Sequence, residues 1–222
     1  MDERRIAGKR LTELSRPYLD VGDRDGLGVR LAEEWSPEPL ALLLECDDTE
    51  VVEVAAVCLG LIGEMAACPS LARALHHDHA PVVEVAENAL WSIWFRAGGR
   101  MGQAVLSRIA RAITAHETEN VVPMLTELVL AQPTYAEVFH QRSQAYYLLD
   151  SYDKALRDAR RTCELNPWHF GALANQANAL VGLGRLQEAL KTYRAVLQLH
   201  PRMHGIRDAI RHLRQLLTPV SS

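Results

Sequence analysis

The sequence predicts an all-helical protein, an α-solenoid in which antiparallel helix pairs stack into a superhelix. Three prolines, Pro133, Pro167 and Pro201, follow one another at intervals of 34 residues, a period typical of helix–turn–helix repeats. Upstream, the segments DDTEVVEVAAVCLGLIG and DHAPVVEVAENALWSIW recur 31 residues apart. Because one helix pair cannot bury its apolar side alone, successive pairs are expected to stack on one another.

The 34-residue register extends beyond proline. AYYLLDSYDKALRDARRTCELNP aligns with ALVGLGRLQEALKTYRAVLQLHP, and the alignment pairs Ala155 with Ala189 and Ser143 with Ala177. This pattern resembles the tetratricopeptide repeat family, in which small residues lie where the two helices of a repeat cross closely. The resemblance implies three repeats over about 102–135, 136–169 and 170–203, within a domain that covers residues 99–222.

The upstream repeat is similar to HEAT-type repeats, in which an acidic turn precedes a helix that begins V-x-x-x-A. Residues 1–98 are therefore expected to form a HEAT-like helical region that ends before the paired glycines Gly98 and Gly99. A β-strand would also suit V-V-E-V, but about 17 residues without a turn signal favour helices over 50–66 and 81–97.

The remaining expected helices follow from apolar periodicity and from helix start and stop signals. VGDRDG, at 21–26, is expected to be a polar loop. The last helix, 203–217, should cap the final repeat with the apolar side formed by Ile206, Ile210, Leu213 and Leu217. The other expected helices are 3–16, 27–35, 38–46, 69–77, 101–114, 118–131, 135–148, 152–165, 169–182 and 186–199.

Charge and composition are those of a soluble globular chain. The 222 residues carry a net charge of −4, with 18 acidic and 9 basic residues in 1–98 and 10 acidic and 15 basic residues in 99–222. The sequence has no apolar run long enough for a membrane span, no secretory signal pattern at its start and no CxxC pair. We expect a cytoplasmic location and neither a membrane nor a nucleic-acid partner.

No catalytic motif is present, so the sequence predicts that the protein is not an enzyme and needs no cofactor. His76, His77 and His79 lie in the segment HHDH. Side chains of adjacent helical residues point about 100° apart, so these imidazoles are not expected to converge on a metal. They suit a helix end, where histidine stabilises the negative terminus.

The resemblance also predicts where a partner would bind. In tetratricopeptide solenoids the first helix of each repeat lines a concave groove, and its inward positions here are His140, Gln144, Tyr147, Asn175 and Asn178. Amide side chains carry both a donor and an acceptor, which suits an extended peptide backbone. The family's carboxylate clamp needs basic residues at positions that are here occupied by His140, Gly205 and Ala209, so a clamp is not expected.

The function predicted from these observations is a protein–protein interaction module that holds a peptide or a helix of a partner protein in its groove. Three alternatives remain at this point. The amides could simply be a solvated surface. HEAT-like repeats also resemble those of bilin lyases, which would make the chain an enzyme or an assembly factor. A self-associating scaffold is the third, and the sequence does not fix the oligomeric state.

Overall fold

The computed structural model describes residues 2–114 and 121–218, and every regular element in those ranges is a helix, as the sequence predicts. The chain divides into two compact parts, an N-terminal unit of residues 1–95 and a C-terminal unit of residues 96–222. Each unit has its own buried core.

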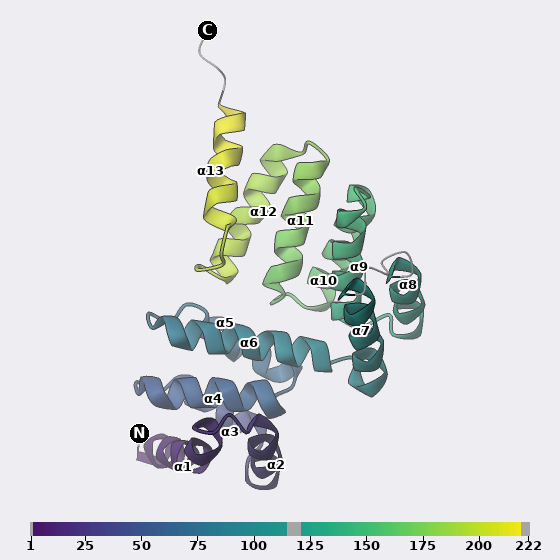
Figure 1. The fold of residues 1–222 in the computed structure, drawn as a ribbon. Coiled ribbons are helices and arrows are strands. Elements are labelled where there is room, and N and C mark those ends of the chain that lie inside the picture. Colours follow the sequence, from purple (N-terminus) through teal and green to yellow (C-terminus); the bar gives the residue numbers. More distant parts are fainter. Residues whose placement is uncertain (1, 115–120, 219–222) are drawn as a thin grey trace. The chain divides into compact units, whose positions relative to one another are not determined.

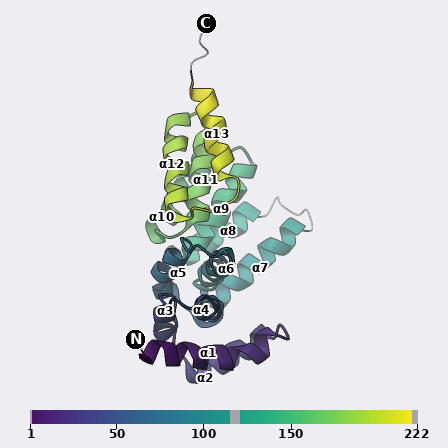
Figure 2. The same cartoon turned by 90° about the vertical axis from the view of Figure 1, so that its left-hand side faces the viewer.

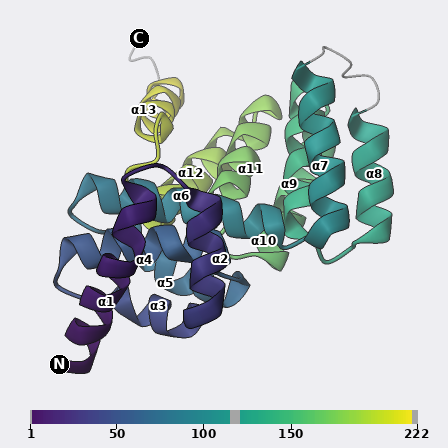
Figure 3. The same cartoon turned by 60° about the horizontal axis from the view of Figure 1, so that its bottom comes forward.

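The N-terminal unit is built around one apolar helix, α4. Seven of its side chains are buried, because its sequence TEVVEVAAVCLGLI is apolar on most sides. Helices α1, α2 and α3 all contact α4 (Figure 3). The helices of this unit are α1 (Asp2–Leu19), α2 (Arg24–Glu34), α3 (Pro37–Leu43), α4 (Thr49–Ile62), the 3-10 turn η1 (Met65–Ala67), α5 (Cys68–Ala74) and α6 (Ala80–Arg96).

The 31-residue repeat places equivalent residues in equivalent positions of α4 and α6. Val52 and Val83 are buried, and so are Leu59 and Leu90. Gly60 permits a close approach between the two helices, because a Cβ atom there would lie 3.3 Å from the Ala89 backbone. The internal repeat is therefore structural, while its assignment to the HEAT type stays a prediction.

Two local expectations for the N-terminal unit are wrong. The segment 21–26 is not wholly a loop, because α2 begins at Arg24. Asp23 starts this helix by accepting a hydrogen bond from the Gly26 N–H at 2.9 Å. The spacing of Ile6, Leu11 and Leu14 also predicts one apolar side for the first helix, but Ile6 is 62% exposed, whereas Leu11 is fully buried.

The C-terminal unit consists of helices that contact one another in chain order (Figure 1). Each contacts its successor, and α9 also contacts α11, the helix one repeat later. Its helices are α7 (Gly99–Thr114), α8 (Val121–Ala131), α9 (Ala136–Leu148), α10 (Tyr152–Leu165), α11 (Phe170–Gly182), α12 (Leu186–Leu199) and α13 (Ile206–Leu217). The expected start of the 118–131 helix falls outside the described residues.

The close helix crossings lie at the small residues that the repeat alignment pairs. Ser143, Ala155, Ala177 and Ala189 are all fully buried. The Ser143 hydroxyl donates to the Ala155 carbonyl at 2.9 Å, which joins α9 to α10. Small side chains at these four positions therefore let the paired helices pack at short range.

The last helix, α13, packs along α12 (Figure 2). Ile206, Ile210 and Leu213 are buried in one core cluster with Ala189, Tyr193 and Val196. Leu217, which was expected to share that side, is only partly buried. This contact covers apolar surface of the α11–α12 pair, which is the arrangement that a capping helix needs.

Candidate functional site

The five residues predicted to face a partner lie on two helices that contact each other. His140, Gln144 and Tyr147 belong to α9, and Asn175 and Asn178 belong to α11. Gln144 and Tyr147 are exposed, and the two asparagines are partly buried. His140 is 1% exposed, so it lies beneath the surface that it was expected to line.

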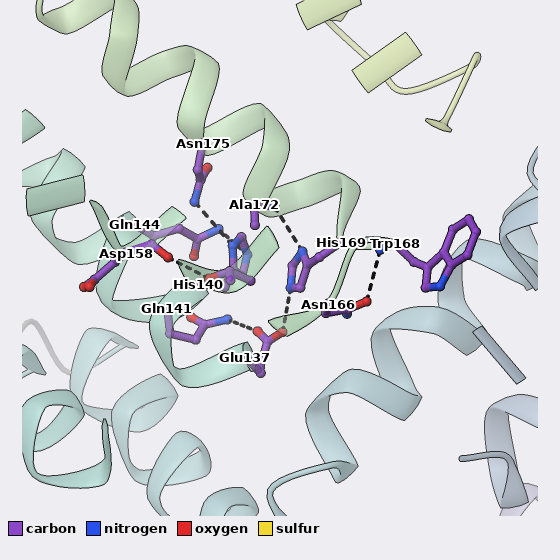
Figure 4. A network of polar contacts seen from close by, with 11 residues as sticks. Glu137, His140, Gln141, Gln144, Asp158, Asn166, Trp168, His169, Ala172 and Asn175 are labelled. Atoms are coloured by element: carbon purple, nitrogen blue, oxygen red, sulfur yellow. Dashed lines mark hydrogen bonds and ion pairs between the residues drawn. The ribbon is translucent and has the colours of Figure 1, made fainter. Parts of the chain in front are cut away.

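Three of these residues meet at the His140 ring (Figure 4). The Gln144 amide nitrogen lies 3.2 Å from His140 Nε2. The Asn175 amide nitrogen lies 3.5 Å from His140 Nδ1, and so joins the two successive repeats. We call Gln144 and Asn175 the amide pair.

The other two predicted residues, Tyr147 and Asn178, make contacts of their own. Asn178 accepts a short hydrogen bond from the hydroxyl of Tyr193, a side chain that is 5% exposed on α12. The Tyr147 ring packs against Tyr152, with ring centroids 5.6 Å apart. Asn178 therefore has a structural role in addition to any contact with a partner.

Two further buried residues near His140, Glu137 and His169, form a hydrogen-bond network. Glu137, in the first turn of α9, accepts hydrogen bonds from Gln141 Nε2 at 2.6 Å and from His169 Nε2 at 3.0 Å. His169 is the N-cap of α11, and its Nδ1 accepts the Ala172 N–H at 3.0 Å. The His140 and His169 rings lie 4.4 Å apart between centroids (Figure 4).

Burial determines the protonation of this network. Removal from water lowers the pKa of His140 to about 3, helped by the neighbouring His169, and burial likewise lowers the pKa of His169 to about 3. Burial raises the pKa of Glu137, against the effects of His140 and of the Gln141 hydrogen bond. Both imidazoles are therefore neutral at neutral pH, since desolvation disfavours the charged form.

Glu137, His140 and His169 are also the described residues whose ligand atoms could surround an ion, because one such atom from each lies within 4.8 Å of the others. The hydrogen bonds argue against a metal centre. His169 Nδ1 accepts the Ala172 N–H, so a neutral ring carries its proton on Nε2, the atom that faces Glu137. A metal at Nε2 would have to remove that proton and leave an imidazolate, or break the helix cap.

The segment HHDH has a local structure of its own. The His79 backbone N–H donates to His77 Nδ1 at 3.0 Å, and the two rings lie edge to face 6.3 Å apart. His76 and His79 are exposed. The absence of a metal from this segment stays a prediction.

Sequence reasoning missed His169 because it precedes the inner helix instead of lying on it. One signal was available. The 34-residue register places His169 opposite Tyr135, and both residues are the N-caps of inner helices and are almost fully buried. A polar side chain that is buried at a helix start needs hydrogen-bond partners, and Glu137 and Ala172 provide them.

No family model matches the chain. Among curated proteins it is similar to a TPR repeat-containing protein of Rhizobium etli, with 24% identity over 124 residues, which cover 56% of this chain and 61% of that protein. It is also similar to Protein STIP1 homolog of Dictyostelium discoideum, with 31% identity over 100 residues. These residues cover 45% of this chain and 18% of that protein. The chain thus spans less than two thirds of the length of these relatives.

Solved structures show the same fold over about half of the chain. The first TPR domain of Spaghetti (RPAP3), bound to HSP90 peptide SRMEEVD, aligns with 52% of this chain and 91% of its own, at 23% identity and a TM-score of 0.50. The Arabidopsis OM64 TPR domain aligns with 52% of this chain and 95% of its own, at 20% identity and a TM-score of 0.50. The chain therefore contains an α-solenoid of the tetratricopeptide-repeat type.

Within the ranges that the structure describes, no helix is long and apolar enough to cross a membrane.

Proposed function

We propose that the C-terminal unit is a non-enzymatic peptide-docking module and that a partner segment binds where α9 and α11 meet. The observation that carries this proposal is the amide pair, in which two uncharged polar side chains from successive repeats lie over one buried ring. Such a surface can hydrogen-bond a peptide without the desolvation of a formal charge. The peptide named for the RPAP3 domain supports this use of the fold.

Tyr147 would add an apolar contact beside the amides. It lies one turn beyond Gln144 on α9, and 37% of its surface is exposed. Tyrosine supplies a large contact area with little loss of conformational freedom. A partner side chain that packs on this ring would fix the register of a peptide held by the amide pair.

The test is a peptide selection with matched variants. Random peptides are selected on the 222-residue chain, and the affinities of the selected peptides are measured by titration calorimetry. The double variant Gln144→Ala with Asn175→Ala should bind them about five- to a hundredfold more weakly. Gln198→Ala removes an exposed amide from α12 and should leave the affinity unchanged.

Asn178 is left intact in this experiment because its loss would strand the Tyr193 hydroxyl. Urea unfolding of each variant shows whether the fold is kept. Equal affinities for the wild type and the double variant would place the binding site away from the amide pair, and the proposal would be wrong.

A further inference from the structure

The tautomer of His140 sets the hydrogen-bonding pattern that the amide pair presents to a ligand. A neutral imidazole has one N–H donor and one acceptor nitrogen. Each ring nitrogen of His140 faces one amide, Gln144 at Nε2 and Asn175 at Nδ1. Two amide NH₂ groups cannot both donate to a ring that has one acceptor.

It follows that one amide turns its nitrogen toward the ring and the other turns its oxygen. Amide oxygen and nitrogen occupy interchangeable positions, so the hydrogen-bond network decides the orientation. The amide with its nitrogen inward presents its oxygen outward, and the amide with its oxygen inward presents its NH₂ outward. The pair then offers a ligand one acceptor and one donor.

We propose that His140 is a positioning residue that fixes this donor–acceptor pair, and that the ligand it selects is a main-chain peptide group within an extended partner segment. A peptide group carries one N–H and one C=O, which complement one acceptor and one donor. A carboxylate carries acceptors only and would leave the outward amide oxygen without a donor. This inference rests on the proposed function and adds the chemistry of its ligand.

The charges around His140 agree with this selection. The buried Glu137 carboxylate lies in the same cluster, and a ligand carboxylate placed above it would face a like charge. A free C-terminus is therefore a poor ligand for the amide pair.

Two variants of His140 separate positioning from a merely structural role. His140→Gln keeps one donor group and one acceptor and should keep the preference of the wild type. His140→Lys offers donors only, so both amides would turn their oxygens inward and present two NH₂ groups to the ligand. Glu137 can pair with the new ammonium group, which makes the lysine variant tolerable in a buried position.

The probes are the peptides selected on the wild-type protein, each made as a free C-terminal acid and as a C-terminal amide. We expect wild type and His140→Gln to bind the two forms within about twofold of each other. His140→Lys should shift the acid-to-amide affinity ratio at least tenfold toward the acid. Binding by the wild type that depends on Gln144 and Asn175 but falls more than tenfold on amidation would overturn the inference and leave the proposed function intact.

A measurement without any ligand completes the test. Nitrogen-15 NMR of the histidine rings should show His140 as a single neutral tautomer from pH 7.5 to 5.5. The side-chain NH₂ signals of Gln144 and Asn175 should shift in His140→Lys and remain in place in Gln198→Ala. A His140 ring that titrates in this range, or that averages between tautomers, would show that nothing fixes the amide pair.

Discussion

His169 forms hydrogen bonds to two repeats at once, through Nε2 to Glu137 on α9 and through Nδ1 to the start of α11. A neutral ring that carries its proton on Nε2 makes both contacts. Protonation of Nδ1 would remove the acceptor that caps α11, so a charged His169 and an intact cap exclude each other.

This relationship predicts acid sensitivity. Burial lowers the pKa of His140 and His169 to about 3, whereas an unfolded histidine has a pKa of about 6.5. Below pH 6.5 the unfolded chain binds protons that the folded chain does not, so the free energy of unfolding should fall by up to about 1.4 kcal/mol for each histidine per unit decrease in pH. Glu137 opposes this trend, because its raised pKa lets the folded chain take up a proton first.

Urea unfolding between pH 7.5 and 5 measures this loss. His169→Asn is the matched variant, since its side-chain oxygen can still cap α11 but does not titrate. We expect it to show about half of the pH dependence of the wild type. An identical dependence in both proteins would mean that other groups cause the acid sensitivity.

A second prediction concerns the ion pair between Arg142 and Asp158. Arg142 donates from Nε at 2.6 Å and from Nη2 at 2.9 Å to the two carboxylate oxygens of Asp158, whose side chain is 6% exposed. Arg142→Ala leaves that buried charge uncompensated and should cost about 3 kcal/mol of unfolding free energy. Arg161→Ala, which breaks the exposed pair with Glu164, should cost less than about 1 kcal/mol. Equal losses in the two variants would contradict this account.

A third prediction concerns the crossing of α11 and α12. Ala189 is fully buried there, so Ala189→Trp should overpack the crossing and cost about 1–3 kcal/mol or more. Gln187→Trp places the same ring at an exposed position and should leave the urea midpoint nearly unchanged. An unaltered midpoint in the buried variant would show that the 34-residue register is misassigned.

A fourth prediction compares equivalent turns of two repeats. Gly184 has φ +71°, and Asp150, at the equivalent position, has φ +53°. The Cβ atom added in Gly184→Ala would have no atom within 4 Å. The variant should therefore lose only the free energy that alanine costs in a left-handed backbone, about 1–2 kcal/mol. Asp150→Gly relieves that strain but loses the hydrogen bond from the Tyr152 hydroxyl, and should change stability by less than about 1 kcal/mol. Thermal unfolding of both variants measures the two changes in stability. A larger loss of stability in Asp150→Gly than in Gly184→Ala would contradict this prediction.

The helices of the repeated segments were predictable because a fixed period places equivalent helices at equivalent positions in the sequence. The expected helices over 152–165 and 186–199 match α10 and α12 end to end. The N-terminal unit was harder because its boundaries depend on single side chains. Asp23 begins α2 inside a segment that reads as a polar loop, and Pro17 lies within α1, where it would ordinarily end a helix.

The sequence was enough to predict which helices carry the candidate-site residues, but not which other residues their side chains contact. Register placed His140, Gln144 and Asn175 on the two inner helices, and the structure brings them together. Register could not show that His140 is buried, nor that Asn178 is hydrogen-bonded to Tyr193, because both depend on residues of other helices. His169 lay outside the inner-helix pattern altogether.

The double contact of His169 also has a consequence for how such chains can be recombined. The sequence period would place a junction between residues 169 and 170, but that cut separates the His169 cap from α11, the helix it starts, although Glu137 keeps its donor. A junction in the exposed turn of residues 148–150, between α9 and α10, keeps the cap with its helix and crosses only the Glu137–His169 bond, which a carboxylate at position 137 of the other parent would restore. Chimaeras joined at that turn would inherit His169 and α11 together, so the block that can be exchanged is offset by half a repeat from the block that the sequence displays.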